Sequence, residues 1–144
     1  MMNLARSGRS LELHTREIFV EEGLKEGKNF SLGSESDVGK KPDFIFPSEA
    51  SYKNADYSQS KLRMLAVKTT CKDRWRQILN EADRIQTKHL LTLQEGVSEN
   101  QFREISNAQV RLVVPEPLIN RYSKSIRPQL QTLASFIADI RLLF

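Results

Sequence analysis

The feature that most constrains the fold is an alternation of short apolar runs with helical patterns in the second half of the chain. The apolar runs are rich in aliphatic and β-branched residues, and the stretches between them repeat apolar residues with helical spacing. This alternation predicts βαβ crossovers, and therefore parallel strands in a sheet that helices cover. The predicted order is strand 64–70, helix 73–85, strand 89–93, helix 98–105 and strand 109–114.

The first half of the chain predicts a looser set of elements around the same sheet. Ser10 is placed to cap a first helix, and Ser98 with Gln101 forms a capping-box pattern. The expected fold class is therefore α/β, in one domain over residues 1–144, with a central mixed sheet flanked by helices. The other predicted elements are a polar start 1–10, helix 11–24, loop 25–41 with a short strand near Phe30, strand 42–47, loop 48–60 and an amphipathic stretch 130–143.

The composition restricts the class of protein. Hydrophobic residues make up 39% of the 144 residues and charged residues 28%, which excludes a disordered acidic tail and a collagen-like fibre. No run approaches the roughly 20 apolar residues of a transmembrane helix, and no signal peptide is recognisable, so we expect a cytoplasmic protein without membrane contact. Cys71 is the one cysteine, which excludes an internal disulfide and fits a reducing compartment.

The net charge of +4 is concentrated in one segment of the chain. Residues 61–76 contain six basic residues and one acidic residue, so the rest of the chain is close to neutral. A local basic cluster of this size is typical of a protein that binds a phosphate backbone. On charge alone, a solvated surface without any partner explains the segment equally well.

Asp43, Lys68 and Glu81 are polar residues at positions where the pattern favours apolar residues or loops. If the strands that contain Asp43 and Lys68 are neighbours, the two side chains meet at one end of the sheet, and Glu81 can face it from the next helix. Carboxylates are preferred ligands of hard divalent cations, and a lysine beside them can hold a phosphate or an attacking water. The three residues therefore predict a site for Mg²⁺ and a phosphodiester. Taken singly, each has a structural explanation as a turn acid, a strand-end lysine or a surface acid.

Lys72, Asp73 and Arg74 place an acceptor between two donors at the expected start of helix 73–85. Lysine or arginine can pair with guanine O6 and N7, and aspartate can accept from cytosine N4, so this segment predicts readout of adjacent guanine and cytosine. Arg74 and Glu81 are seven residues apart in the sequence and would share one flank of that helix. The alternatives are a helix cap for Asp73 and phosphate contacts without sequence meaning for the two basic residues.

Other reactive residues do not form a recognisable site. His14 and His89 lack a metal-ligand spacing, and Trp75 heads an apolar stripe that indicates a core position. Cys71 adjoins the basic segment, which can lower the pKa of a thiol, but no base accompanies it. The glycine-rich residues 23–39 lack the lysine pattern of a P-loop, so no nucleotide cofactor is expected.

Residues 64–82 form a long and unusual block, MLAVKTTCKDRWRQILNEA. This block resembles the EcoRII C-terminal catalytic domain family of type II restriction endonucleases. Shorter segments are similar to the same family: SLELH at 10–14, KPDF at 41–44, LQEGVS at 93–98 and LVVP at 112–115. The resemblance runs in order from about residue 7 to residue 143 and covers nearly the whole chain.

The resemblance implies the PD-D/E-x-K nuclease fold and Mg²⁺-dependent cleavage of double-stranded DNA at short CCWGG-like sites. It implies that Asp43 is the aspartate of the PD pair and Lys68 the catalytic lysine. The usual second acid is here Ala66, and Glu81 matches a displaced acid that the family carries on the following helix, so Asp43 and Glu81 are the implied metal ligands. The remaining matches are Lys72, Asp73 and Arg74 with the segment that reads C:G pairs, Glu12 with a first-helix acid near the site, and Tyr52 with a tyrosine near the active centre.

Enzymes of the EcoRII type carry an N-terminal effector domain, which we do not find in these 144 residues. We therefore expect a single catalytic domain that acts as a homodimer and cuts both strands of a near-palindromic DNA site. Two alternatives stay open: a truncated remnant that binds DNA without cutting it, and a structure-directed repair or recombination nuclease. The complete set of Asp43, Lys68 and Glu81 argues against the first, and the segment 72–74 argues against the second.

Overall fold

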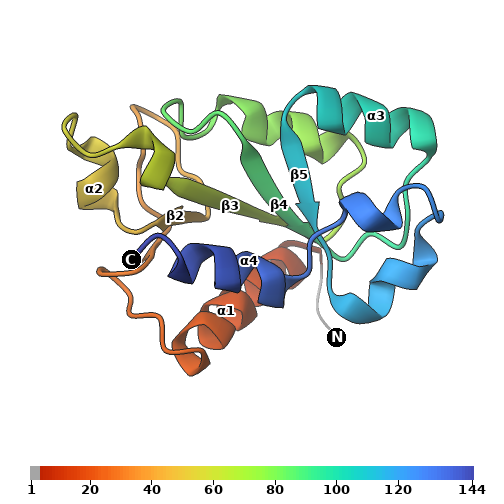
Figure 1. Ribbon diagram of the computed structural model, residues 1–144, viewed down its shortest axis with the longest axis horizontal. Helices are drawn as coiled ribbons and strands as arrows, with labels where there is room; N and C mark the ends of the chain where they lie inside the picture. The colour runs from red at the N-terminus through yellow and green to blue at the C-terminus, as the bar shows by residue number, and fades with distance from the viewer. Residues whose placement is uncertain (1–3) are drawn as a thin grey trace.

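The computed structural model describes residues 4–144, and a five-stranded mixed sheet lies at its centre (Figure 1). The strands lie side by side in the order in which they follow along the chain. The first three strands are antiparallel neighbours, and the third, fourth and fifth are parallel. Their bounds are β1 Ser31–Leu32, β2 Phe44–Phe46, β3 Arg63–Lys68, β4 Lys88–Thr92 and β5 Val110–Val113.

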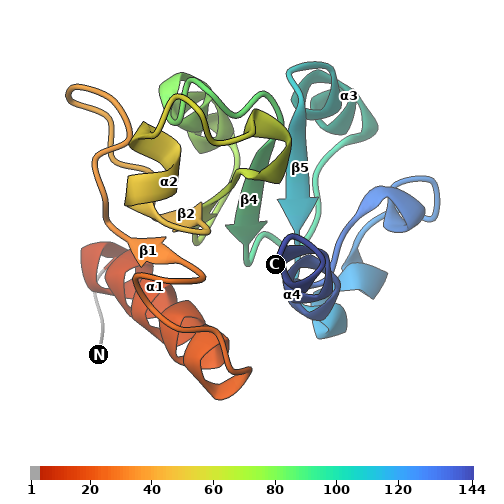
Figure 2. The same cartoon turned by 60° about the vertical axis from the view of Figure 1, so that its left-hand side comes forward.

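Helices cover both faces of this sheet (Figures 1 and 2). The α-helices are α1 Leu4–Glu21, α2 Glu49–Lys53, α3 Glu99–Asn107 and α4 Leu133–Arg141, and the 3₁₀ helices are η1 Gln59–Lys61, η2 Asp73–Asn80, η3 Glu116–Arg121 and η4 Arg127–Gln129. Helices α1 and α4 pack on one face, and α2, α3 and η2 pack on the other. Within residues 4–144, none of the helices has the length and apolar character to cross a membrane.

Strand β3 separates two hydrophobic cores. Met64 and Ala66 belong to the core under α2, α3 and η2, whereas Leu65 and Val67 belong to the core under α1 and α4. All four side chains are buried, as expected for a strand whose alternating side chains meet helices on both faces of the sheet. The second core also contains a chain of aromatic ring contacts among Phe19, Phe30, Phe44, Phe46 and Phe136.

The predicted α/β fold class is confirmed, because a mixed sheet is flanked by helices and β3, β4 and β5 are joined by the crossovers η2 and α3. Two differences from the prediction concern helices in the first half of the chain. Helix α1 begins at Leu4, so Ser10 lies inside the helix and does not cap it; good helix formers at positions 4–6 outweigh the cost of Gly8. Helix α2 occupies part of the predicted loop 48–60, because Ser48 Oγ caps it by accepting the Ser51 N–H at 3.1 Å. Residues 1–3 of the polar start lie outside the described residues.

The largest correction concerns the α-helix predicted over residues 73–85. The observed η2 is a 3₁₀ helix that ends at Asn80, and Glu81 has an extended backbone, with φ −89° and ψ 147°. Ala82 then takes a φ of +50°. Side chains from other segments accept the N–H groups of residues 82–84, so tertiary hydrogen bonds replace the α-helical ones. Arg74 therefore does not share a helix flank with Glu81, which lies beyond the end of η2.

The capping pattern of Ser98 and Gln101 is confirmed in one of its two bonds. Ser98 Oγ accepts the Gln101 N–H at 3.0 Å and caps α3. The Gln101 side chain does not complete the box, because its amide nitrogen donates to the Lys72 carbonyl at 3.2 Å. Helix α3 is thereby tied to the start of η2.

Candidate active site

Asp43 and Lys68 lie at the same end of the sheet because β2 and β3 are antiparallel neighbours. Asp43 directly precedes β2, and Lys68 is the last residue of β3. The Asp43 carboxylate Oδ2 accepts a hydrogen bond from the Val67 N–H at 2.6 Å. This bond holds the carboxylate against the strand backbone of the residue that precedes Lys68.

Glu81 directly follows η2 and brings a second carboxylate to the same end of the sheet. Its backbone N–H donates to the Ile78 carbonyl at 3.0 Å, and its carboxylate interacts electrostatically with Asp43 and Lys68. Among the described residues, the buried oxygen Oε1 of Glu81 has no hydrogen-bond partner. A buried carboxylate oxygen without a partner is costly, so this atom is suited to a ligand that the protein itself does not supply.

Ala66 accounts for the unusual origin of this second acid. Ala66 lies two residues before Lys68, on the same face of β3, and is fully buried under η2. Its methyl group cannot bind a cation, so the strand itself contributes no carboxylate at that position. Glu81 directly follows η2, the helix that packs on that face.

Burial raises the pKa values of the acids at this end of the sheet, and the Asp43 charge adds to the rise for Glu81. Burial, with a smaller contribution from the Asp43 charge, raises the pKa of Glu81 to about 7. Burial also raises the pKa of Asp43, although the Val67 N–H and the Lys68 charge oppose it. Carboxylates that are partly dehydrated and close together are in a setting that a bound cation would relieve.

Glu12 joins this group from α1. Burial and the Asp43 charge raise the pKa of Glu12, while the charges of Arg9 and Lys68 oppose the rise. The Glu12 carboxylate is 3.9 Å from the Arg9 guanidinium. The structure therefore brings Glu12 into electrostatic contact with the same aspartate and lysine that interact with Glu81.

Tyr52 is not hydrogen-bonded to these acids. It lies in α2 and is 2% exposed. Its hydroxyl donates to the Asp37 carboxylate at 2.8 Å and accepts the Arg84 N–H at 3.0 Å. Burial raises the pKa of Tyr52 to about 12, so the hydroxyl keeps its proton. Tyr52 thus supports the backbone three residues beyond Glu81.

The acids of the site suit Mg²⁺ better than a cation that requires a complete protein cage. Within residues 4–144, no group of three or more His, Cys, Asp or Glu residues is arranged to hold a metal ion. Mg²⁺ keeps several water molecules and is usually bound by one or two carboxylates together with substrate phosphates. The Asp43 carboxylate and the unpartnered oxygen of Glu81 are the groups that could form such a donor set.

Lys72, Asp73 and Arg74 are exposed at the start of η2. Lys72 occupies the cap position, so the interpretation of Asp73 as a helix cap is wrong. Arg76 is engaged, because its guanidinium is 2.9 Å from the Glu104 carboxylate and lies over the Trp75 ring. The Arg74 side chain is exposed and forms no hydrogen bond or ion pair with any other residue that the structure describes, so its guanidinium can contact an external ligand.

Two glutamines hold the backbone of this exposed segment, a role that the sequence does not indicate for either of them. The Cys71 N–H donates to Gln94 Oε1 at 3.3 Å, and the Gln101 amide donates to the Lys72 carbonyl at 3.2 Å. Neither glutamine lies near the segment in sequence, so no local pattern could have identified them. Cys71 itself is fully buried, and burial raises the pKa of its thiol; the expected lowering by the neighbouring basic residues is therefore wrong.

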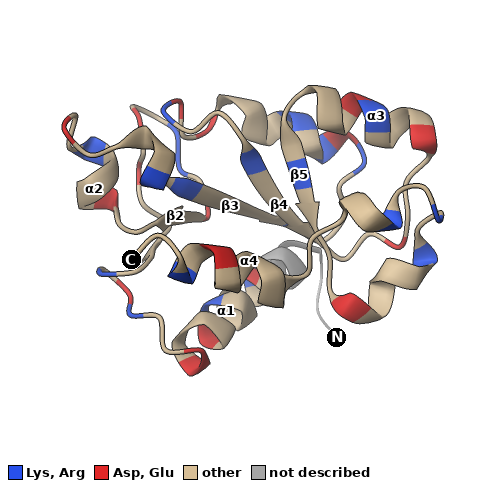
Figure 3. Cartoon of the chain, in the orientation of Figure 1, with Lys and Arg blue, Asp and Glu red and all other residues tan. Residues whose placement is uncertain are grey.

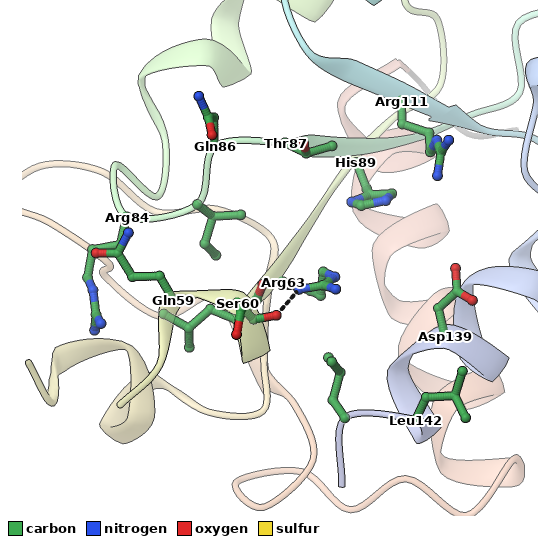
Figure 4. A pocket seen from close by; sticks show the side chains of 13 residues that line it. Gln59, Ser60, Arg63, Arg84, Gln86, Thr87, His89, Arg111, Asp139 and Leu142 are labelled. Carbon is green, nitrogen blue, oxygen red and sulfur yellow. Dashed lines mark hydrogen bonds between the residues drawn. The ribbon is translucent and has the colours of Figure 1, made fainter. Parts of the chain in front are cut away.

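A second polar region lies at the opposite end of the parallel strands. Figure 3 shows basic residues in the first parts of β3, β4 and β5. A cavity of about 600 Å³ opens there, and Arg63, His89, Arg111 and Asp139 line it (Figure 4). Burial and the charges of Arg111 and Arg63 lower the pKa of His89 to about 4, so its imidazole is neutral at physiological pH. None of the three residues of the candidate site lines this cavity.

Comparison with known proteins gives a consistent result. A sequence profile of the family described as EcoRII C terminal matches residues 2–137. The chain is 52% identical over 136 residues to "Type II restriction enzyme EcoRII" of Escherichia coli, a match that covers 94% of this chain. The match covers 33% of that relative, so the chain spans about a third of the length of the characterised enzyme.

Two solved structures share the fold. The chain superposes on "Metal-depleted Ecl18kI in complex with uncleaved, modified DNA" with a TM-score of 0.79 and 20% identity. It superposes on the same protein "in complex with uncleaved DNA" with a TM-score of 0.78 and 21% identity, and both matches cover 97% of this chain and 46% of the other. These likenesses show a restriction-endonuclease-like fold, and the profile covers nearly the whole chain. The chain therefore belongs to the EcoRII C-terminal family of type II restriction endonucleases.

Proposed function

We propose that this chain is the catalytic domain of a Mg²⁺-dependent endonuclease that hydrolyses double-stranded DNA at a short CCWGG-like site. The observation that carries the proposal is the grouping of Asp43, Lys68 and Glu81 at one end of the sheet, close in sequence to an exposed basic segment at the start of η2. Membership of a restriction endonuclease family supports the same activity.

Asp43 and Glu81 are the residues that would hold the Mg²⁺ ion. A bound Mg²⁺ polarises the phosphoryl group and assists ionisation of the attacking water. Lys68 supplies a compact positive charge at the same end of β3, suited to holding a phosphate oxygen and stabilising the negative charge that develops on it. Because the pKa of Glu81 is about 7, its carboxyl group must lose a proton before it can bind a cation.

Lys72, Asp73 and Arg74 would read the C:G pairs of the site. Their side chains are exposed, and the glutamine bonds to the Cys71 N–H and the Lys72 carbonyl fix the backbone that presents them. A fixed backbone limits the positions that each side chain can reach, which favours base readout over diffuse phosphate contact.

The active form would be a homodimer. One group of Asp43, Lys68 and Glu81 per chain cuts one strand, so two copies related by a two-fold axis would cut both strands of a near-palindromic site. The same symmetry would place one reading segment on each half of the site.

The proposal is tested by digesting a plasmid of known sequence in the presence of Mg²⁺ and mapping the ends of the products. We expect discrete fragments that end at CCWGG-like sites, and no cleavage by Asp43→Asn. Specific binding without cleavage by the wild-type chain would favour a DNA-binding domain that does not cut. A smear of fragments with no common end would favour a structure-directed nuclease.

A further inference from the structure

The turn that follows Glu81 is held by side chains from distant segments of the chain. Each of the first three N–H groups of this turn, residues 82–85, has an acceptor outside the turn. The bonds are Ala82 N–H to Ser36 Oγ at 3.3 Å, Asp83 N–H to Asp37 Oδ2 at 3.2 Å and Arg84 N–H to the Tyr52 hydroxyl at 3.0 Å. The conformation of the turn is therefore set by tertiary contacts and not by local helix formation.

Lys88 holds the same turn through its carbonyl groups. Lys88 is the first residue of β4 and is 5% exposed. Its ammonium group donates to the Ala82 carbonyl at 2.7 Å and to the Ile85 carbonyl. Buried carbonyl groups need such partners, and a buried ammonium group is tolerated only when it is hydrogen-bonded. Lys88 thus joins both ends of the turn to β4.

Strand β4, which begins with Lys88, links the turn to the strand that carries Lys68. Strand β4 pairs in parallel with β3, the strand that ends in Lys68. Ala82 directly follows Glu81 in the chain. A shift of the turn relative to β4 would therefore also move the Glu81 carboxylate relative to Lys68 and Asp43. Lys88 is the residue that bridges the turn and the sheet from within the core.

We propose that Lys88 is a positioning residue, which holds the turn 82–85 so that the Glu81 carboxylate faces Asp43 and can bind a cation. This inference rests on the proposed function, because it assigns Lys88 to the support of a proposed metal ligand. Residues that orient metal ligands typically change metal affinity by about 10–100-fold when they are removed. Lys88 is not expected to contact DNA, since its ammonium group is occupied inside the protein.

The test compares Lys88→Met with Lys40→Met. Methionine keeps the length of Lys88 but removes its charge and its donors. Lys40 is a matched control, because its ammonium reaches the same turn only at the surface, 2.8 Å from the Asp83 carboxylate. Binding of Mn²⁺ to the chain on a cleavage-resistant cognate duplex is measured by calorimetry. DNA affinity is measured by gel shift in EDTA, and protection of the 82–84 amides is measured by hydrogen exchange.

For Lys88→Met we expect Mn²⁺ affinity to fall by at least about tenfold, exchange of the 82–84 amides to accelerate, and DNA affinity to change by less than about twofold. For Lys40→Met we expect Mn²⁺ affinity and DNA affinity to match the wild type. If Lys88→Met does not fold, Lys88→Gln, which keeps one donor group, is judged by the same comparison.

Unchanged Mn²⁺ affinity in a folded Lys88 variant would overturn the positioning role, as would an equal loss in Lys40→Met. Equal loss of Mn²⁺ and DNA affinity would also overturn it, because a general structural defect explains that pattern. A wild-type chain that binds DNA but no Mn²⁺ would refute the proposed metal site itself, and the role of Lys88 with it.

Discussion

Glu81→Gln should change how the stability of the protein depends on pH. The pKa of Glu81 is raised from 4.5 to about 7 in the folded chain, mainly by burial and next by the Asp43 charge. Between these two values the folded protein keeps the proton that the unfolded chain has lost. The free energy of unfolding must therefore fall as the pH rises through this window, with the contribution fully present below about pH 4.5 and lost above about pH 7.

The size of the effect follows from the shift. A change from 4.5 to about 7 corresponds to about 3 kcal/mol if the whole shift is expressed in stability. Glu81 is only partly buried, so solvent screening reduces this figure, and we expect about 1–2 kcal/mol. Glutamine has nearly the same shape and no proton to lose, so Glu81→Gln should not show this loss.

The assay is urea denaturation of both proteins in EDTA at about pH 4.5 and about pH 8. EDTA is needed because a cation bound to the folded state would stabilise ionised Glu81. We expect the wild type to lose about 1–2 kcal/mol relative to Glu81→Gln between the two pH values. Glu116→Gln, which replaces an exposed acid, should follow the wild type. Parallel behaviour of wild type and Glu81→Gln would refute the argument that burial sets the pKa of Glu81.

Four further predictions concern DNA and metal. Asp43→Ala should reduce cleavage by orders of magnitude while DNA binding in EDTA stays equal or tightens, because the change removes a proposed metal ligand and a negative charge; cleavage and gel-shift assays check both. Lys68→Ala should also abolish cleavage, with a modest loss of DNA affinity in the same gel shifts. Arg74→Ala should cost about 1–3 kcal/mol of discrimination at each half-site and leave the salt dependence of non-specific binding unchanged; equal losses on cognate and scrambled duplexes would make Arg74 a phosphate contact. Mn²⁺ affinity, measured by calorimetry, should rise with pH up to about 7 and then level off, because a proton competes for Glu81 below that value.

The elements that follow a strong local pattern could be predicted from the sequence. The alternation in the second half gave the parallel strands β3, β4 and β5, and the apolar segment between Pro42 and Pro47 gave β2. Strands that are buried on both faces of a sheet have near-continuous apolar sequences, and such runs are recognisable without knowledge of the fold.

The geometry around Glu81 could not be predicted, because it depends on contacts between distant residues. The apolar stripe after Trp75 is also compatible with an α-helix, but the distant acceptors Ser36, Asp37 and Tyr52 divert the backbone. The burial of Lys88 could not be predicted either, since lysine side chains are ordinarily exposed to solvent. Sequence reasoning could place the acids near one sheet end, but the buried bonds that aim Glu81 required the fold.

The short helix η2 separates Lys72 at one end from Glu81 at the other, and this arrangement has a thermodynamic consequence. If DNA bound at the first end steadies η2, it also lowers the entropy that remains to be lost when a cation binds at the second end. Linkage then requires the converse, so a cation must strengthen the binding of cognate DNA by the same factor. A scrambled duplex, which the chain would contact only through phosphates, would gain less affinity from the cation. The cation would therefore increase the preference of the chain for cognate over scrambled DNA.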